Sequence, residues 1–495
     1  MRKVFVLITA VPFLMALMAG CGGSGHHTTA NSVPIVLTIQ DQSTIPTGLT
    51  VVSLSVQVTG VTLQGSTGSQ SSTSLLSSPV TVNLSNLQTV NELLANTSAD
   101  AGTYSSIMIT FANASATVLN NSTTTFSDGT TSCPPATSNT TTCTLAPAFN
   151  PTSVTISTAP FPLTLTANTP ININIDFNTG ESFANSNGTL SLAPSVTVTT
   201  NTTTNATTGN LNDFVNVTGQ VTAVGTNQVT VTDTETGQTL TLGTTNNTVF
   251  NNFNTSSTCT TANTFACVQK DQIVSLNFGT TGASGTTPTI SSISLQNGIT
   301  QGVTGTVIGV TPGSNTAEVV ITGITPAFAT ANSGVKVGQV VTVTTNPQTT
   351  FSIESNGATL PSGLNFASLG DVGVGQSVVL NSTAFTAGTG GAAGMLTADQ
   401  VMLAPTQFTG TINSLNTGSQ SFTTNELNGL FTNNDVNQVT VDTGTGTTFT
   451  GVTGFSGLAS GNNVTMGGLL FQTSTGPVLV GQQVGVTTTT TTAAD

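Results

Sequence analysis

Short runs in which apolar and polar residues alternate make up much of the chain after residue 32. Clear examples are VPIVLTIQ (33–40), LTVVSLSVQVTGVTLQG (49–65) and AGTYSSIMITFANASATV (101–118). Alternation with a period of two puts successive side chains on opposite faces of a β-strand, so that one face can be buried. Val, Ile and Thr are abundant in these runs, and branching at Cβ favours the strand conformation. The pattern predicts an all-β protein.

The alternating runs between 33 and 200 predict an N-terminal β-sandwich-like domain. The stretch QTVNELLANTSADAG (88–102) breaks the alternation and predicts a short helix or turn. Tyr104, the one tyrosine of the chain, follows Ala-Gly at the start of a strand. At a sandwich corner, such a ring packs on the core and its hydroxyl bonds to nearby backbone. The alternative for Tyr104 is a role in stacking on a ligand or donating a proton.

The second half of the chain repeats itself after a low-complexity linker at 201–214. Three openers share an apolar-Thr-Gly start, and each is followed by a Thr-Phe element. They predict three small β-barrel-like repeats, at 215–298, 301–405 and 407–487. A tail at 488–495 is expected to be disordered.

Each repeat is also expected to carry a closing strand. These strands are QKDQIVSL (269–276), GVGQSVVL (373–380) and LVGQQVGV (479–486), with KVGQVVTV (336–343) as an extra copy in the second repeat. A further strand follows the closing strand in the first two repeats. On this alignment the third repeat lacks that last strand.

Residues 1–20 are typical of a secretory signal peptide. Arg2 and Lys3 precede an apolar run from Val4 to Met18, and small residues come before Cys21. One alternative is an ordinary signal peptide in which Cys21 has no role. Another is an uncleaved anchor, although the run is short for a membrane span of about 20 residues.

The Ala-Gly-Cys sequence that ends at Cys21 resembles the lipobox of bacterial lipoproteins. Met18 stands where the lipobox usually has Leu. The resemblance implies cleavage before Cys21 and acylation of that cysteine, and two or more acyl chains anchor a protein stably. Gly22, in place of the Asp that retains some lipoproteins at the inner membrane, implies sorting to the outer membrane. Residues 21–32 then form a flexible tether, which includes His26 and His27.

Charge is scarce in the whole sequence, because only 4% of the 495 residues are charged. The formal net charge is −14, and cleavage after residue 20 would leave 18 acids against Lys270 and Lys336, a charge of −16. Such a chain cannot neutralise a phosphate backbone, which excludes nucleic acid as an expected partner. It also lacks basic patches for an anionic membrane surface. The expected partners are the membrane, through the N-terminal lipid, and other envelope or surface molecules.

Four cysteines remain besides Cys21, in two local pairs: Cys133 with Cys143, and Cys259 with Cys267. An even number of cysteines in an exported chain indicates disulfides. A metal site built from all four is the alternative, but the CxxC spacing that such sites favour is absent.

Candidate catalytic chemistry is sparse, because both histidines lie in the tether and a hydrolytic triad needs a base beside its nucleophile. Asp233 and Glu235 in DTETG (233–237) could serve as paired carboxylates, but the stretch is first of all typical of a hairpin turn. This stretch and DTGTG at 442–446, with Asp442, faintly resemble the start of a calcium loop. We therefore expect a protein that is not an enzyme, with no cofactor and no metal site, and with calcium at these turns as an open alternative.

The order of the first strands resembles the bacterial lipoprotein family known as domain of unknown function 4382. The similarity rests on a first strand that ends near Asp41, a V-x-V-x-x-V strand at 56–61, and Ala101, Gly102, Tyr104 and Ile107. It covers about 33–200, and the family implies no activity. The repeats resemble a second family, domain of unknown function 5666. Together these features predict a lipid-anchored cell-envelope protein with a structural, adhesin-like or interaction role. The alternative is a module that binds a small molecule, glycan or calcium.

Overall fold

The structure is a computed structural model of the whole chain. It describes residues 32–41, 48–66, 71–136, 141–205, 209–253, 259, 263–281, 287–296, 301–355, 360–383, 385–388 and 393–486. The predicted signal peptide, Cys21, His26, His27 and the tail after 487 lie outside these residues. The described residues are almost entirely strands and loops, as the alternation predicts. They include no helix long and apolar enough to cross a bilayer.

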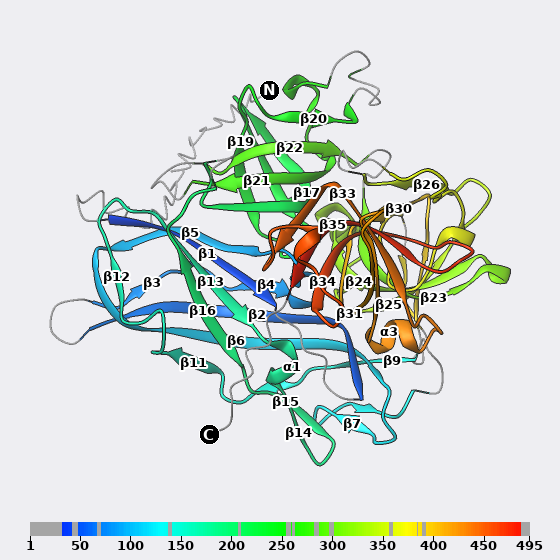
Figure 1. Cartoon of the computed structure of the whole chain (residues 1–495), viewed down its shortest axis with the longest axis horizontal. Helices are drawn as coiled ribbons and strands as arrows, with labels where there is room; N and C mark the ends of the chain where they lie inside the picture. Colours follow the sequence, from blue (N-terminus) through cyan, green and yellow to red (C-terminus); the bar gives the residue numbers. More distant parts are fainter. Residues whose placement is uncertain are drawn as a thin grey trace, which may run out of the picture.

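The N-terminal region is a β-sandwich, as predicted (Figure 1). One sheet has the order β16-β13-β1-β5, and the facing sheet has β2 and β6 at its centre. The first comprises β1 (Ser32–Asp41), β5 (Glu92–Asp100), β13 (Ile171–Phe177) and β16 (Val196–Asn201). The second comprises β2 (Leu49–Gly65), β3 (Thr73–Ser74), β4 (Val80–Asn83), β6 (Gly102–Asn120), β9 (Thr142–Leu145), β11 (Ser153–Ile156) and β12 (Leu163–Leu165).

A small third sheet and two short helical segments complete this region. The sheet contains β7 (Phe126–Ser127), β8 (Ser132–Cys133), β10 (Ala148–Phe149), β14 (Phe183–Ser186) and β15 (Thr189–Leu192). The helical segments are the 3₁₀ turn η1 (Leu84–Asn86) and α1 (Thr179–Ser182). The apolar core lies between the two main sheets and includes fully buried Leu37, Val56 and Phe111.

Tyr104 occupies the predicted corner role. Its ring is fully buried at the start of β6, and its hydroxyl donates a 3.0 Å hydrogen bond to the carbonyl of Asp100. The short helix or turn predicted at 88–102 is wrong, because residues 92–100 form β5 and pair with β1. Its alternation is broken because both of its faces are buried: Leu94 packs in the sandwich core and Leu93 packs against the next unit.

Three further barrel-like units follow. The first has β17 (Asn212–Gly225), β18 (Gln228–Asp233), β19 (Thr239–Gly243), β20 (Val249–Asn251), η3 (Phe265–Cys267), β21 (Ile273–Thr280) and β22 (Thr289–Leu295). The second has β23 (Gly302–Thr311), η4 (Pro312–Ser314), β24 (Thr316–Ile324), α2 (Pro326–Ala331), β25 (Val340–Thr344), β26 (Thr350–Ile353), η5 (Leu369–Asp371), β27 (Ser377–Asn381), β28 (Phe385–Thr386), β29 (Gly394–Thr397) and β30 (Gln400–Ala404). The third has β31 (Thr406–Asn416), β32 (Ser421–Asn425), α3 (Gly429–Thr432), β33 (Val439–Thr450), η6 (Phe455–Gly457), β34 (Asn463–Phe471) and β35 (Val478–Val486).

All three units share one strand order. In the third, β31-β32-β33-β35-β34 form a closed barrel. In the first, β19 pairs with β22, so that β17-β18-β19-β22-β21 follow the same closed order. In the second, the last strand is split into β29, which pairs with β25, and β30, which pairs with β27. The predicted lack of a last strand in the third unit is wrong: LVGQQVGV forms β35, which is that strand, and β34 is the closing strand.

A recurrent turn explains the Gly-Gln signature that precedes the closing strand. An amide side chain accepts a hydrogen bond from the backbone N–H three residues earlier, and the residue before the amide has a positive φ. The acceptors and donors are Gln272 with Gln269 (2.7 Å), Gln376 with Gly373 (2.8 Å), Asn462 with Ala459 (2.8 Å) and Gln339 with Lys336 (3.1 Å). The positive φ falls on Asp271, Gly375, Gly461 and Gly338 respectively. Glycine and aspartate tolerate this conformation. The third unit keeps the glycine, Gly461, and has Asn462 where the other turns have Gln.

The four regions pack against one another, as the blue-to-cyan, green, yellow and red parts of Figure 1 show. Val36 of the sandwich belongs to the core of the first barrel unit. Val52, Ile308 and Leu430 form an apolar cluster that joins the sandwich to the second and third units. Phe471 of the third unit packs in the core of the second. These shared clusters make one body of the four regions and enclose the polar sites between them.

Candidate functional site

A polar cavity of about 100 Å³ lies where the sandwich and all three barrel units meet. We call it the junction cavity. Its wall includes four acidic side chains, from three of the four regions: Glu92, Asp233, Glu235 and Glu354. Neutral amides such as Gln407 and Gln482 and hydroxyls such as Thr304 provide much of the remaining polar wall, and no lysine or arginine is among the described residues that line it.

The segment from Asn86 to Leu93 of the sandwich is hydrogen-bonded to the first and third barrel units. Asn86 donates a 3.1 Å hydrogen bond from Nδ2 to Glu235 Oε2 of the first barrel unit. Gln407 of the third unit donates from Nε2 to the Asn86 carbonyl, and its Oε1 accepts from the Thr89 N–H, both at 2.7 Å. This segment therefore joins distant parts of the chain through hydrogen bonds that involve side chains.

The DTETG stretch is a turn, as predicted, and its first two residues, Asp233 and Thr234, are buried. Asp233 Oδ1 accepts hydrogen bonds from the N–H groups of Glu235 and Thr236, at 2.7 and 2.9 Å. These bonds shape the turn between β18 and β19. The carbonyl of Thr234 accepts from the Ile324 N–H of the second unit at 3.0 Å. The turn is thus inserted between the sandwich and the second barrel unit.

Burial dominates the electrostatics of the junction cavity, because it penalises an ionised carboxyl group. It raises the pKa of Glu235 to about 7; the nearby Asp233 adds to this rise, and the hydrogen bond from Asn86 opposes it. Burial also raises the pKa of Glu92 well above its ordinary value, with contributions from Asp233 and Glu235. The pKa of Asp233 is raised by burial, against its hydrogen bonds from Thr236 and Glu235. Glu92 and Glu235 keep some accessible surface, as expected for residues on a cavity wall.

A second and larger cavity, of about 730 Å³, lies between the sandwich, the first unit and the third unit. Its wall is rich in amides and hydroxyls, including Asn91, Asn277, Thr448 and Thr450. We call it the outer cleft. Asp41 and Asp213 supply its acidic groups, and no basic residue is among the described residues that line it. The wall is suited to a neutral polar molecule and is poorly suited to an anion.

Asp41, which was singled out by the family resemblance, ends β1 and lies at this cleft. It is 3% exposed, and its Oδ1 accepts from the Thr179 N–H at 3.0 Å. Burial raises the pKa of Asp41 to about 7; hydrogen bonds from Thr179 oppose the rise, and the charge of Asp176 adds to it. Its main structural effect is to hold α1 against the end of β1.

The second stretch that faintly resembles a calcium loop begins at Asp442. Asp442 does not lie in a turn: it is within β33 and pairs with Ser421 of β32, because the following glycines form a bulge inside the strand. The described residues hold no group of three or more His, Cys, Asp or Glu side chains arranged to bind a metal ion. Lys270 is exposed and pairs with Asp271 at 3.8 Å.

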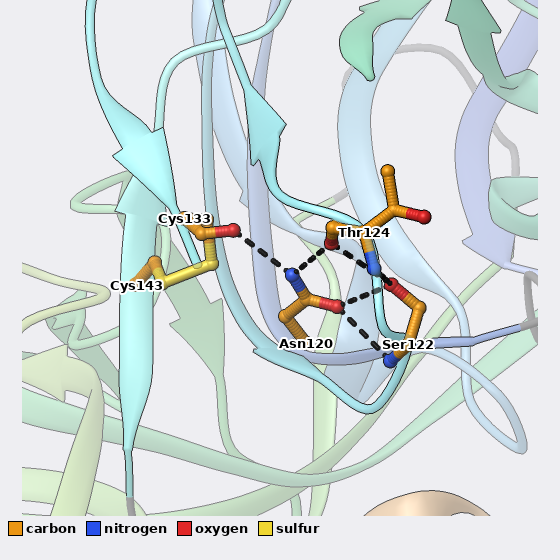
Figure 2. The surroundings of a disulfide bond; sticks show 5 residues. All are labelled: Asn120, Ser122, Thr124, Cys133 and Cys143. Atoms are coloured by element: carbon orange, nitrogen blue, oxygen red, sulfur yellow. Dashed lines mark hydrogen bonds between the residues drawn. A yellow bond between two sulfur atoms is a disulfide. The ribbon is translucent and has the colours of Figure 1, made fainter. Parts of the chain in front are cut away.

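The cysteines pair locally, Cys133 with Cys143 and Cys259 with Cys267. Figure 2 shows the surroundings of the first bridge. Buried Asn120 donates from Nδ2 to the carbonyls of Thr124 and Cys133, at 2.8 and 2.9 Å. Its Oδ1 accepts from the N–H and the hydroxyl of Ser122, at 3.0 and 2.8 Å. One amide side chain therefore fixes the loop that leads from β6 into the disulfide.

Residues 34–194 match the family described as Domain of unknown function (DUF4382). This match bears out the resemblance seen in the first strands. No curated protein matches the sequence. Among solved structures, the chain is similar at a TM-score of 0.11 and 8% identity to one titled "drosophila Unr CSD456", over 55% of this chain and 98% of that chain.

Several residues of the junction cavity have no local sequence signal. Asn86, Gln407 and Gln482 lie far apart from one another in the sequence, and nothing near Asn86 indicates that it meets the other two. The scarcity of charge was a usable signal for the acids, because a Glu or Asp in a chain with 4% charged residues is unusual wherever it occurs. Glu92 and Glu354 could have been marked as candidates on that ground.

Proposed function

We propose that this protein is a lipid-anchored, extracytoplasmic component of the bacterial cell envelope, with a structural or interaction role and no catalytic activity. The observation that carries the proposal is the lipobox-like sequence that ends at Cys21, followed by a polar tether. Two local disulfides support export, since such bonds persist in oxidising compartments. The match of residues 34–194 to Domain of unknown function (DUF4382) names no function, so the lipoprotein assignment depends on the lipobox-like sequence.

The mutual docking of the four regions supports a scaffold or adhesin-like role. A chain of independent modules would be joined by flexible linkers, whereas here apolar clusters and hydrogen bonds join each region to its neighbours. Such a body presents a fixed outer surface at the end of its tether. We propose further that the three barrel units belong to the family known as domain of unknown function 5666 and that the anchor lies in the outer membrane.

Cys21→Ala tests the anchor. The wild-type protein should incorporate an alkyne-labelled acyl chain and sediment with outer membranes, and the variant should be unlabelled and should leave the membrane fraction. A wild-type protein without label, or a variant that stays with the membranes, would overturn the proposal. Cys133→Ala with Cys143→Ala is a matched control, because it removes cysteines without touching the lipobox.

A second candidate function is binding of a neutral polar molecule such as an oligosaccharide in the outer cleft. Its volume of about 730 Å³ is within the range of small-molecule sites. Screening of neutral oligosaccharides should find saturable binding that Thr448→Trp abolishes by filling the cleft. Thr386→Trp, on an exposed strand elsewhere, should leave that binding intact. Binding that survives Thr448→Trp, or the lack of saturable binding by any probe, would rule out this second candidate function.

A further inference from the structure

We propose that the turn at 233–238 is a proton-dependent latch, which holds the first barrel unit against the sandwich and the second barrel unit when the carboxyl groups of the junction cavity are protonated, and loosens when they ionise. The inference does not depend on the membrane anchor.

The turn is held by hydrogen bonds on both sides. On the sandwich side, Asn86 donates to Glu235 at 3.1 Å, and Gln238 Nε2 donates to the Leu93 carbonyl at 2.9 Å. On the side of the second unit, the Ile324 N–H donates to the Thr234 carbonyl at 3.0 Å. Movement of the turn would break its contacts with the sandwich and with the second unit at once. The position of the turn therefore depends on how these two regions and the first unit are docked.

Among the described residues that line the junction cavity around the turn, the charged and titratable groups are all acidic. Glu92 comes from β5, Asp233 and Glu235 come from the turn itself, and Glu354 follows β26 of the second unit. The rest of the polar wall consists of amides, hydroxyls and backbone groups. Lys270 and Lys336 are not among the residues that line the cavity. Ionisation of Glu92, Asp233 and Glu235 therefore adds like charges within a small volume, and no basic residue is among the described residues that line it.

Protonation changes what the same groups can do. A protonated carboxyl group is a hydrogen-bond donor as well as an acceptor, whereas an ionised one can only accept. In a wall rich in amide oxygens and carboxyl groups, protonation therefore adds donors. Because burial raises the pKa of Glu235 to about 7, this change falls near neutral pH.

Apolar packing limits how far the latch can open. Val36 and Leu93 of the sandwich are part of the core of the first unit, and Ile273 of that unit packs on Val379 and Met402 of the second. These contacts do not titrate. Ionisation is therefore expected to loosen the turn and the facing segment locally, without separating the regions.

Hydrogen exchange on the mature full-length chain provides the test, since it measures local opening. After correction for intrinsic rates, the amides of 233–238 and 86–93 should lose at least about tenfold protection between pH 5 and pH 8, since each pKa unit corresponds to a tenfold change in population. Glu235→Gln keeps an oxygen that can accept from Asn86 but cannot ionise. It should retain most of the protection at pH 8, and Glu92→Gln should add to this effect.

Glu181→Gln is the matched control, because it makes the same change at an exposed residue outside the junction cavity. It should exchange as the wild type does at both pH values. Equal protection of the two segments at pH 5 and pH 8 in the wild type would overturn the proposal, even if no variant folds. So would a loss of protection that is uniform over β31–β35 as well, or one that Glu235→Gln leaves unchanged.

Discussion

The side-chain amide of Asn86 donates a hydrogen bond to Glu235, a residue 149 positions further along the chain. The bond joins the end of η1 in the sandwich to the turn of the first barrel unit. Asn86 is also bonded through its carbonyl to Gln407 of the third unit, at 2.7 Å. Asn86 therefore contacts two of the regions that dock on the sandwich. A charge introduced at this position should affect the carboxyl groups of the junction cavity.

Replacement of Asn86 by Asp should destabilise the protein in a pH-dependent way. The new side chain removes a donor and adds a fifth carboxyl group to a cavity wall that already has four. We expect a loss of about 2–3 kcal/mol in the free energy of unfolding at pH 8 and a smaller loss at pH 5. Asn86→Leu, which removes the donor but adds no charge, should cost about 1–2 kcal/mol at both pH values. Denaturant titrations of the two variants measure this difference, and equal pH profiles would contradict the electrostatic explanation.

The recurrent amide turn should contribute unequally to the three barrel units. Gln376 is fully buried, accepts from Gly373 and donates to the carbonyls of Asp371 and Leu470, the latter in the third unit. Gln376→Leu should cost about 3 kcal/mol or more, because it removes three hydrogen bonds to backbone groups, two of them buried. Gln272, at the same position in the first unit, is only partly buried, so Gln272→Leu should cost about 1 kcal/mol. Thermal unfolding compares them, and similar losses would count against burial as the cause.

The local features of this fold could be predicted from the sequence because their causes are local. Alternation in β2 and β6 reflects a sheet with one face on the core, and the corner role of Tyr104 follows from its place beside Ala-Gly. The cysteines are close enough in sequence to pair with each other. The turn at Asp233 could also be predicted, since an aspartate that bonds two following N–H groups is a local arrangement.

The missed features depend on contacts between distant segments. β5 was predicted as a helix or turn because Leu93 and Leu94 are adjacent and both buried, which breaks the alternation on which strand prediction depends. Leu93 is buried only because the first barrel unit packs on it. The last strand of the third unit was missed because its Gly-Gln pair resembles the amide turn that here uses Gly461 and Asn462. The junction cavity forms only where all four regions pack together, so it cannot be predicted from any single segment of the sequence.

Asn120 should be essential for the loop that contains the first disulfide. It is 1% exposed and makes four hydrogen bonds, to Ser122, Thr124 and Cys133. Asn120→Leu should lower the free energy of unfolding by about 2–4 kcal/mol, since buried donors and acceptors lose their partners. Ser122→Ala removes only the hydroxyl and should cost about 1 kcal/mol. Denaturant unfolding under oxidising conditions measures both, and a neutral effect of Asn120→Leu would show that the loop is held by the disulfide alone.

The overall stability should fall as pH rises from about 4 to about 7, and Asp41 should contribute much of the fall. The pKa of Asp41 is about 7 in the folded protein, against an ordinary value of 3.8. Below the lower value the group is protonated in both states and has no effect. Between the two values the folded state keeps a proton that the unfolded state has lost, so each pH unit costs about 1.4 kcal/mol, up to about 4 kcal/mol above pH 7.

Asp41→Asn removes that dependence while keeping an oxygen that can accept from Thr179. The variant should match the wild type near pH 4 and be more stable at pH 8, by about 2–4 kcal/mol. Asp271→Asn makes the same change at an exposed residue with a positive φ that asparagine tolerates, and it should leave the pH profile unchanged. Thermal unfolding between pH 4 and pH 8 distinguishes them. A parallel decline in wild type and Asp41→Asn would place the source of the pH dependence in the other buried acids, with Glu92, Asp233 and Glu235 of the junction cavity as the groups to replace next.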